Sequence, residues 1–404
     1  MLNNRLYGAA LAAALVACPA VADETAAPGF LSIPGTDTKM KPYGIAYLNG
    51  WFFRDQDLGD TGALVGGSTN PLMPGNSPDR QFGMTARYSR IGLTTVTPST
   101  RFGDITTLLE MDFTKEASKT GGLKLRHAYV TFGNWTLGHT CSNWLDVDAT
   151  GETMDMNGPV GQACNGSGRF TQARYRFPLS RRSGLAFSVE QNRMGWGQFT
   201  GDIVGAPAST AAVPDARYPT LTGAYTFTDD WGHWSLRAME QSLGAYTLAS
   251  GQRSDQWGGA VQLSGTVKLG KDSLVGSIYS GRGLGDYGVG IQAARYDSQD
   301  LLLFRNQGWQ AGYTHNWTGR VRSNLVASGV TFNDNAAVQP VTIKNAMNYF
   351  ANTFVKLSPS VELGMEYGYE DLRTFGANAV TQRDGGQSDR NHSNKLQVSL
   401  TAKF

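Results

Sequence analysis

Apolar and polar residues alternate along most of this chain, and the final segment shows the pattern most simply. Leu396, Val398, Leu400 and Ala402 occupy every second position, and polar residues fill the places between them. A period of two places one set of side chains on each face of a β-strand. The chain ends on the aromatic residue Phe404, directly after this strand.

The same alternation recurs along the chain and predicts about sixteen strands. The clearest example is "VELGMEYGYE", in which one face is apolar and the other carries glycine and carboxylates. The predicted strands are 43–55, 85–96, 104–115, 123–132, 135–143, 169–177, 185–192, 217–228, 233–245, 255–269, 273–281, 307–317, 321–332, 344–356, 361–372 and 392–404.

The connections between these strands alternate in length. Short turns such as "GN", "DDWG", "GKD" and "TGR" are followed by long polar loops. Short turns on one rim and long loops on the other are typical of an up-and-down barrel in an outer membrane. The predicted long loops are 56–80, 142–168, 193–216, 283–306 and 376–391.

We therefore expect an all-β fold, a transmembrane antiparallel β-barrel of about 16 strands. Backbone groups in a bilayer are all satisfied only if the sheet closes, which favours an even barrel. Trp135, Trp231, Trp234 and Trp317 lie beside short turns, where an aromatic girdle belongs. The aromatic end at Phe404 resembles the signal that barrel-insertion machinery recognises, and Phe404 is expected to close the barrel against the first strand.

The first residues predict export. Arg5, an apolar stretch and the small residues Ala20 and Ala22 fit a secretory signal over residues 1–22. Cys18 also fits a lipoprotein processing site, so two processing routes stay open. We expect an N-terminal periplasmic segment at 23–42 and a barrel at 43–404, in the outer membrane of a Gram-negative cell.

The composition of the chain limits the classes of partner that we expect. Glycine supplies 50 of 404 residues, above the usual share, as expected for a chain with many tight turns. Lys and Arg number 35 against 33 Asp and Glu, so net charge predicts no nucleic-acid partner. The expected surroundings are outer-membrane lipid and lipopolysaccharide.

Four stretches carry a family resemblance: "GFLSIPGTDTKMKPYG", "TARYSRIGL", "LKLRHAYVTFGN" and "ETMDMNGPVGQ". They resemble the DcaP-like family of trimeric outer-membrane porins. The resemblance implies a sixteen-stranded barrel, a homotrimer, a constriction made by the inward-folded third loop, and passage of small anions such as dicarboxylates. This chain lacks the coiled-coil heptads that some family members carry before "IPGTDT", so functions of that extension are not expected here.

The loop 142–168 is the candidate constriction loop because it is rich in carboxylates, and the neighbouring strands carry cations. Alternation in "LKLRHAYV" and "QARYRF" directs the basic side chains to the lumen, where arginines concentrate and bind carboxylates. Alternatively, these cations merely balance Glu110 and Asp112. The candidate loop acids are Asp146, Asp148, Glu152 and Asp155, and the candidate pore-lining cations are Arg87, Arg90, Lys124, Arg126, Arg174 and Arg176.

Cys141 and Cys164 lie at the base and in the second half of this loop, in a compartment that permits disulfides. A bridge between them is expected to stabilise the loop by about 3 kcal/mol, with free thiols as the alternative. His139 alone does not make a metal site.

Enzymatic chemistry finds little support in the sequence. The five histidines are scattered over different strands and no G-x-S-x-G motif occurs. The glycines of "GLGDYG" match G-x-G-x-x-G, but no capped helix follows, so no cofactor is expected. We expect a diffusion porin rather than an enzyme; an outer-membrane lipid esterase and a non-conducting barrel lipoprotein stay as alternatives.

Overall fold

The computed structural model describes most of the barrel and part of its loops. The described residues are 29–54, 81–114, 122–159, 168–192, 199–201, 212–214, 217–247, 250–288, 293–296, 301–333, 343–375, 380–381, 387–388 and 390–404. The signal segment 1–22, residue 164 and most of the predicted loops 56–80, 193–216 and 376–391 therefore lie outside the described residues.

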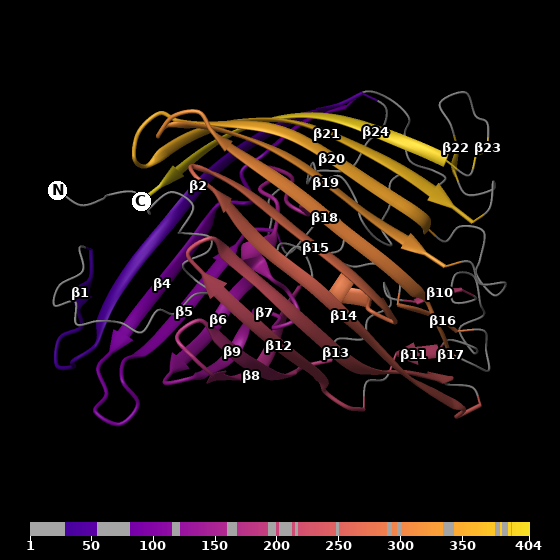
Figure 1. Ribbon diagram of the computed structural model, residues 1–404, viewed down its shortest axis with the longest axis horizontal. Coiled ribbons are helices and arrows are strands. Elements are labelled where there is room, and N and C mark those ends of the chain that lie inside the picture. The colour runs from indigo at the N-terminus through magenta and orange to yellow at the C-terminus, as the bar shows by residue number, and fades with distance from the viewer. Residues whose placement is uncertain are drawn as a thin grey trace.

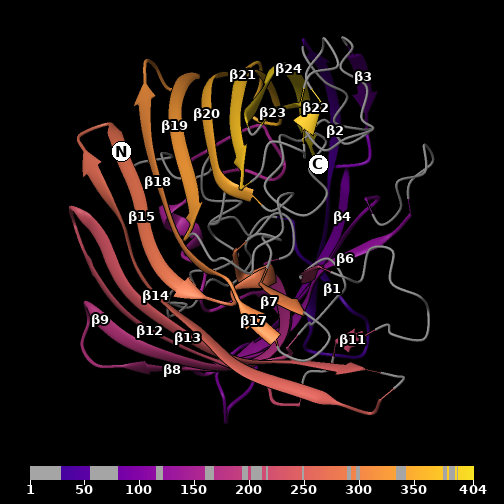
Figure 2. The ribbon, with the colours of Figure 1, turned by 90° about the vertical axis from the view of Figure 1, so that its right-hand side faces the viewer.

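Sixteen antiparallel strands form one closed barrel, which Figures 1 and 2 show from two sides. The strands, in ring order, are β2 (Lys39–Phe53), β4 (Arg90–Thr97), β5 (Ile105–Asp112), β6 (Lys124–Phe132), β7 (Trp135–Cys141), β8 (Arg169–Pro178), β9 (Ser183–Glu190), β12 (Thr220–Asp229), β13 (Gly232–Thr247), β14 (Arg253–Leu269), β15 (Asp272–Arg282), β18 (Arg305–Asn316), β19 (Val321–Phe332), β20 (Ile343–Lys356), β21 (Val361–Thr374) and β24 (Arg390–Lys403). The predicted fold class is confirmed, and each predicted strand corresponds to one of these.

Short elements complete the description. β3 (Gln81–Thr85) pairs with the end of β2 and precedes β4 in the same wall. The others are β1 (Leu31–Ser32), β10 (Phe199–Gly201), β11 (Ala212–Pro214), β16 (Ala294–Tyr296), β17 (Leu301–Leu303), β22 (Val380–Thr381), β23 (Gln387–Ser388) and the 3₁₀ turns η2 (Val147–Ala149) and η5 (Gly285–Gly288).

The last strand closes the ring against the first. β24 pairs with β2, and the backbone groups of Phe404 and Gly44 exchange two hydrogen bonds at 2.9 and 3.0 Å. The aromatic ring of Phe404 lies over Gly44, where an added Cβ would stand 2.3 Å from it. The expected closure by Phe404 is thus seen in the structure, while its role as an insertion signal stays a prediction.

The barrel is apolar outside and polar inside, as the period-two pattern predicts. On β21, Met365 and Tyr367 are exposed on the outer surface, whereas Glu366 and Glu370 are fully buried in the interior. Trp231 and Trp317 are exposed beside the short turns. This distribution suits a sheet with lipid on one side and water on the other.

The start of the barrel differs from the expectation. β2 begins at Lys39 rather than at Tyr43, and Lys39–Pro42 pairs with the end of β4. Lysines and a proline conceal the alternation in this stretch, so the predicted segment 23–42 overlaps the first strand. Pro42 is tolerated there although it donates no backbone hydrogen bond.

Candidate functional site

The described part of the loop, residues 142–159, enters the barrel and contacts its inner wall. The N–H of Ser142 donates to the carbonyl of Gly168 at 3.0 Å, which closes the base of the loop between β7 and β8. Trp144 is fully buried and packs with Tyr279 of β15. The loop thus leaves its own strands and reaches the wall made by β13, β14 and β15.

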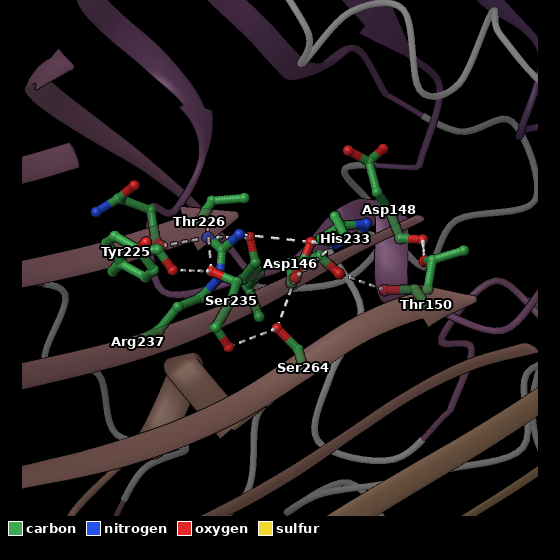
Figure 3. Close-up of polar contacts among 12 residues, drawn as sticks. Asp146, Asp148, Thr150, Tyr225, Thr226, His233, Ser235, Arg237 and Ser264 are labelled. Carbon is green, nitrogen blue, oxygen red and sulfur yellow. Dashed lines mark hydrogen bonds and ion pairs between the residues drawn. The ribbon is translucent and has the colours of Figure 1, made fainter. Parts of the chain in front are cut away.

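The first attachment centres on Asp146, as Figure 3 shows. Nε2 of His233 lies 3.1 Å and Nη2 of Arg237 lies 3.4 Å from its carboxylate, and the hydroxyl of Ser264 donates to it. Arg237 also donates to the carbonyls of Asn143 and Leu145, at 2.8 and 3.1 Å. One guanidinium from β13 therefore binds both the backbone and a side chain of the loop.

These contacts keep Asp146 ionised. Burial opposes ionisation, but the charge of Arg237 and the hydrogen bonds from His233 and Ser264 outweigh it and hold the pKa of Asp146 well below its usual range. This carboxylate is therefore engaged by the wall rather than presented to the lumen.

The second attachment uses polar side chains from neighbouring strands. The carboxylate of Glu366 accepts the N–H groups of Met154 and Asp155 at 2.7 and 2.9 Å. Asn352, next to Glu366 on the adjoining strand, donates to the carbonyl of Glu152 at 2.9 Å. These bonds replace the sheet partners that a loop backbone lacks.

Two ion pairs reinforce the second attachment. Arg322 of β19 donates to Glu152 at 2.6 and 2.8 Å, in a bidentate geometry. Lys395 of β24 contacts Asp155, and both side chains are completely buried. Three of the four predicted loop acids are thus paired with cations of the wall from β13 to β24.

Asp148 differs from the other three acids. Figure 3 shows its carboxylate pointing away from Asp146 and His233. The side chain is exposed, and among the described residues it is the backbone carbonyl of Asp148 that accepts a hydrogen bond, from the hydroxyl of Thr266 at 2.7 Å. Surrounding protein atoms and the charge of Asp146 raise the pKa of Asp148.

On the β4–β6 wall, part of the positive charge is balanced locally. Arg90 lies 3.3 Å from Glu110, and Arg126 pairs with Asp112 and lies 3.5 Å from Glu110. These two predicted pore-lining cations are paired with carboxylates of the intervening strand, and their role in the pore stays a prediction.

The remaining predicted cations have different surroundings. Arg174 donates to the neutral oxygens of Gln172 and Cys141. Arg176 is exposed on the same face, closer to the short turns. Arg87 lies buried between β3 and β4, and Lys124 is half-buried at the start of β6.

A β-bulge in β6 turns a further basic side chain, that of His127, toward the interior, which the alternation did not predict. In the pairing of β5 with β6, Glu110 faces His127 and Met111 faces Leu125, which leaves Arg126 as an extra residue. Both Arg126 and His127 are buried, and His127 lies 3.3 Å from Arg169. Alternation along β8 would place Arg169 on the outer face with Thr171 and Ala173, so the sequence pattern signals neither the burial of Arg169 nor the bulge.

One of the two cysteines of the predicted disulfide lies within the described residues. Cys141 is buried at the base of the loop, whereas residue 164 lies outside the described residues. The bridge between Cys141 and Cys164 stays a prediction.

The described residues do not arrange Ser264, His233 and Asp146 as in a serine hydrolase. Asp146 contacts both the hydroxyl and the imidazole, whereas hydrolases place the imidazole between the serine and the carboxylate. Within the described residues, no three His, Cys, Asp or Glu side chains could hold a metal ion. In the same part of the chain, no helix is long and apolar enough to cross a membrane.

Comparison with known proteins agrees with the barrel fold. A family model described as DcaP outer membrane protein matches residues 32–382. The chain belongs to the DcaP outer membrane protein family. The DcaP family assignment and the barrel place this protein in the outer membrane. A comparison with curated protein sequences finds no match.

Solved structures share the fold of this DcaP family member at low identity. The outer membrane channel DcaP of Acinetobacter baumannii has a TM-score of 0.76 and 20% identity, with 93% of this chain and 99% of that chain covered. An anion-selective porin from Comamonas acidovorans has a TM-score of 0.59 and 14% identity, with 91% and 100% covered. OmpF of Salmonella typhi, solved with daunomycin, has a TM-score of 0.56 and 10% identity, with 93% and 100% covered.

Proposed function

We infer that this DcaP family protein is a non-enzymatic diffusion porin that prefers small anions, with dicarboxylates among its solutes. The observation that carries the proposal is that three of the four candidate loop acids have cationic partners, whereas part of the positive charge in the lumen has no acidic partner among the described residues. Asp146, Glu152 and Asp155 are each paired with wall cations, whereas Arg174 has neutral hydrogen-bond partners. The loop acids therefore cancel little of the positive field of the β4–β8 wall.

The ring order sets these two charge groups apart. β7 and β8 stand eight places from β19 and β20 among the sixteen strands, so they face each other across the lumen. The loop lies along the wall from β13 to β24, which leaves the basic wall of β4–β8 open to a passing solute. Comamonas acidovorans supplies a structural neighbour described as anion-selective, which agrees with this direction.

The magnitudes fit a weak site. A carboxylate about 4 Å from a guanidinium gains about 4 kcal/mol at an effective dielectric constant near 20, and about 1 kcal/mol in bulk water. Millimolar affinity corresponds to about 4 kcal/mol. A few such contacts concentrate a dicarboxylate, and tighter binding would slow its exit.

We propose a homotrimer, since the porin neighbours include a trimeric form of OmpT. Purified protein reconstituted in planar bilayers should open in discrete steps and close in three equal steps. Absence of conductance would favour the lipoprotein alternative. Ester hydrolysis without conductance would favour the lipid esterase.

A further inference from the structure

Two arginines stand side by side on the outer surface of the barrel. Arg282 ends β15 and Arg305 begins β18, and the two residues are directly paired across these strands. Both are exposed, and their inward-facing neighbours Gly281 and Asn306 mark the opposite face. Like charges at directly paired positions repel each other, so this pair costs stability as it stands.

The described chain supplies no anion to this pair. Neither guanidinium has an ion pair or a side-chain hydrogen bond within the described residues. Arg305 and Arg282 belong to a row of directly paired residues, here called the rung, that runs across the strands. On β14 this rung continues with Gly259, and on β13 with the exposed Glu240. The rung therefore presents two cations, a gap and one carboxylate to the surroundings of the barrel.

The height of the rung is that of a lipid headgroup. β15 covers 11 residues from a short turn to Arg282, and β18 covers 12 residues from Arg305 to a short turn. With about 3.3 Å per residue and a tilt of about 40°, these strands rise about 28 Å, close to the apolar band of about 25 Å. Arg282 and Arg305 thus lie where the band ends on the side of the long loops.

An apolar groove of about 700 Å³ on the outer surface of β9 to β15 extends to Arg282. Its sides are formed by Phe187, Leu221, Trp257 and Val261, and Arg282 lines its edge. Gly223 and Gly259 lie between the large side chains, so the surface is hollowed there. Glu240 lines the groove together with Arg282, so the apolar sides lead to a cation and a carboxylate. Such a groove fits an acyl chain whose phosphate group binds the arginines and carries a divalent cation.

We propose that the β9–β18 outer wall holds one phosphorylated glycolipid of the outer leaflet, of the lipid A type. Its phosphate bridges Arg282 and Arg305, and one acyl chain lies in the groove. Arginine pairs bind phosphate oxygens bidentately, and a dianion removes the repulsion between the two guanidinium groups. The carboxylate of Glu240 meets a divalent cation that such phosphates carry.

Native mass spectrometry of the detergent-purified protein tests the proposal. The probes are bis-phosphorylated lipid A and its dephosphorylated form, each added at increasing ratio. The parent should retain the phosphorylated form at least about tenfold better. The double variant Arg282→Ala/Arg305→Ala should lose at least about tenfold of this affinity, and the double variant Lys268→Ala/Lys271→Ala at the short-turn rim should keep it.

A second variant tests the groove. A Cβ on Gly223 would meet Phe187 at 3.5 Å, an ordinary contact, so Gly223→Leu fills the groove without a backbone clash. We expect weaker retention of lipid A and unchanged conductance, because the groove lies outside the lumen. Equal retention of both lipid forms by the parent would overturn the proposal, as would dissociation of the oligomer in Gly223→Leu, which would identify this wall as a contact between copies.

Discussion

Arg322 of β19 donates two hydrogen bonds to Glu152, at 2.6 and 2.8 Å, and so ties the candidate constriction loop to the wall. The same guanidinium binds Glu362 at 2.6 and 3.0 Å and lies 4.4 Å from the ring centre of Phe354. One cation thus pairs with two carboxylates at once.

Removing this guanidinium should make the pore less favourable to anions. Arg322→Ala leaves Glu152 and Glu362 unpaired, so the reversal potential in a salt gradient should move toward cations. The pair with Glu152 is partly exposed, so its loss alone should make unfolding easier by only about 1 kcal/mol or less. Arg322→Lys keeps the charge without the bidentate geometry and should shift selectivity less. An unchanged reversal potential in Arg322→Ala would refute the role given to this residue.

The buried pair of Lys395 and Asp155 should matter more for stability. Lys395→Met leaves a completely buried carboxylate without its cation, at a cost of about 3–5 kcal/mol. The measurement is the free energy of unfolding in urea, in detergent micelles. Asp155→Asn combined with Lys395→Met should recover part of the loss, because the carboxylate of Asp155 is removed together with its cation while Glu366 keeps its hydrogen bonds from the loop. A single variant as stable as the parent would contradict this account of the loop attachment.

Selectivity should depend on pH through Asp148. Its pKa is raised, so lowering the pH protonates Asp148 before ordinary carboxyl groups and removes a negative charge from the lumen. Anion preference should therefore increase between about pH 7 and about pH 4. Asp146 has a lowered pKa and stays ionised over this range, so its attachment persists. Asp148→Asn should show the acidic selectivity already at neutral pH, and a parent-like pH profile in this variant would rule Asp148 out.

The mature chain should begin at Asp23 and carry a bridge between Cys141 and Cys164. Its intact mass should then be about two mass units below that of the reduced protein, and a diacylglyceryl adduct on Cys18 would establish the lipoprotein route instead. Cys141→Ser should make the current noisier, because the bridge restricts the loop. Quiet, parent-like channels in this variant would show that the loop does not need the bridge.

The strands were predictable because the surroundings of a barrel impose a period of two. In "VELGMEYGYE" the apolar set, such as Met365, faces outward, and the polar set, such as Glu366, faces inward. This signal persists in each strand, since lipid and lumen water act along its whole length. It fades at Lys39–Pro42, where the outer side lies at the rim of the barrel and carries no strict apolar requirement.

The attachments of the loop were not predictable from spacing. Glu152 and Arg322 are 170 positions apart, and Asp155 and Lys395 are 240 apart. Alternation places Arg237, Arg322 and Lys395 inside the barrel, but their pairing with particular acids depends on how the ring closes. Proximity in sequence favours partners on the strands next to the loop, whereas the loop binds the walls farther around the ring.

The central claim is that the basic wall is left open while most of the loop acids are neutralised. The most direct test is the reversal potential of the channel in a potassium chloride gradient. The account predicts an anion-selective parent and a shift toward cations in Arg174→Ala and Arg176→Ala. Arg282→Ala, which removes an equal charge from the outer surface, should leave the potential unchanged. A cation-selective parent, or equal potentials in the parent and both lumen variants, would contradict the claim.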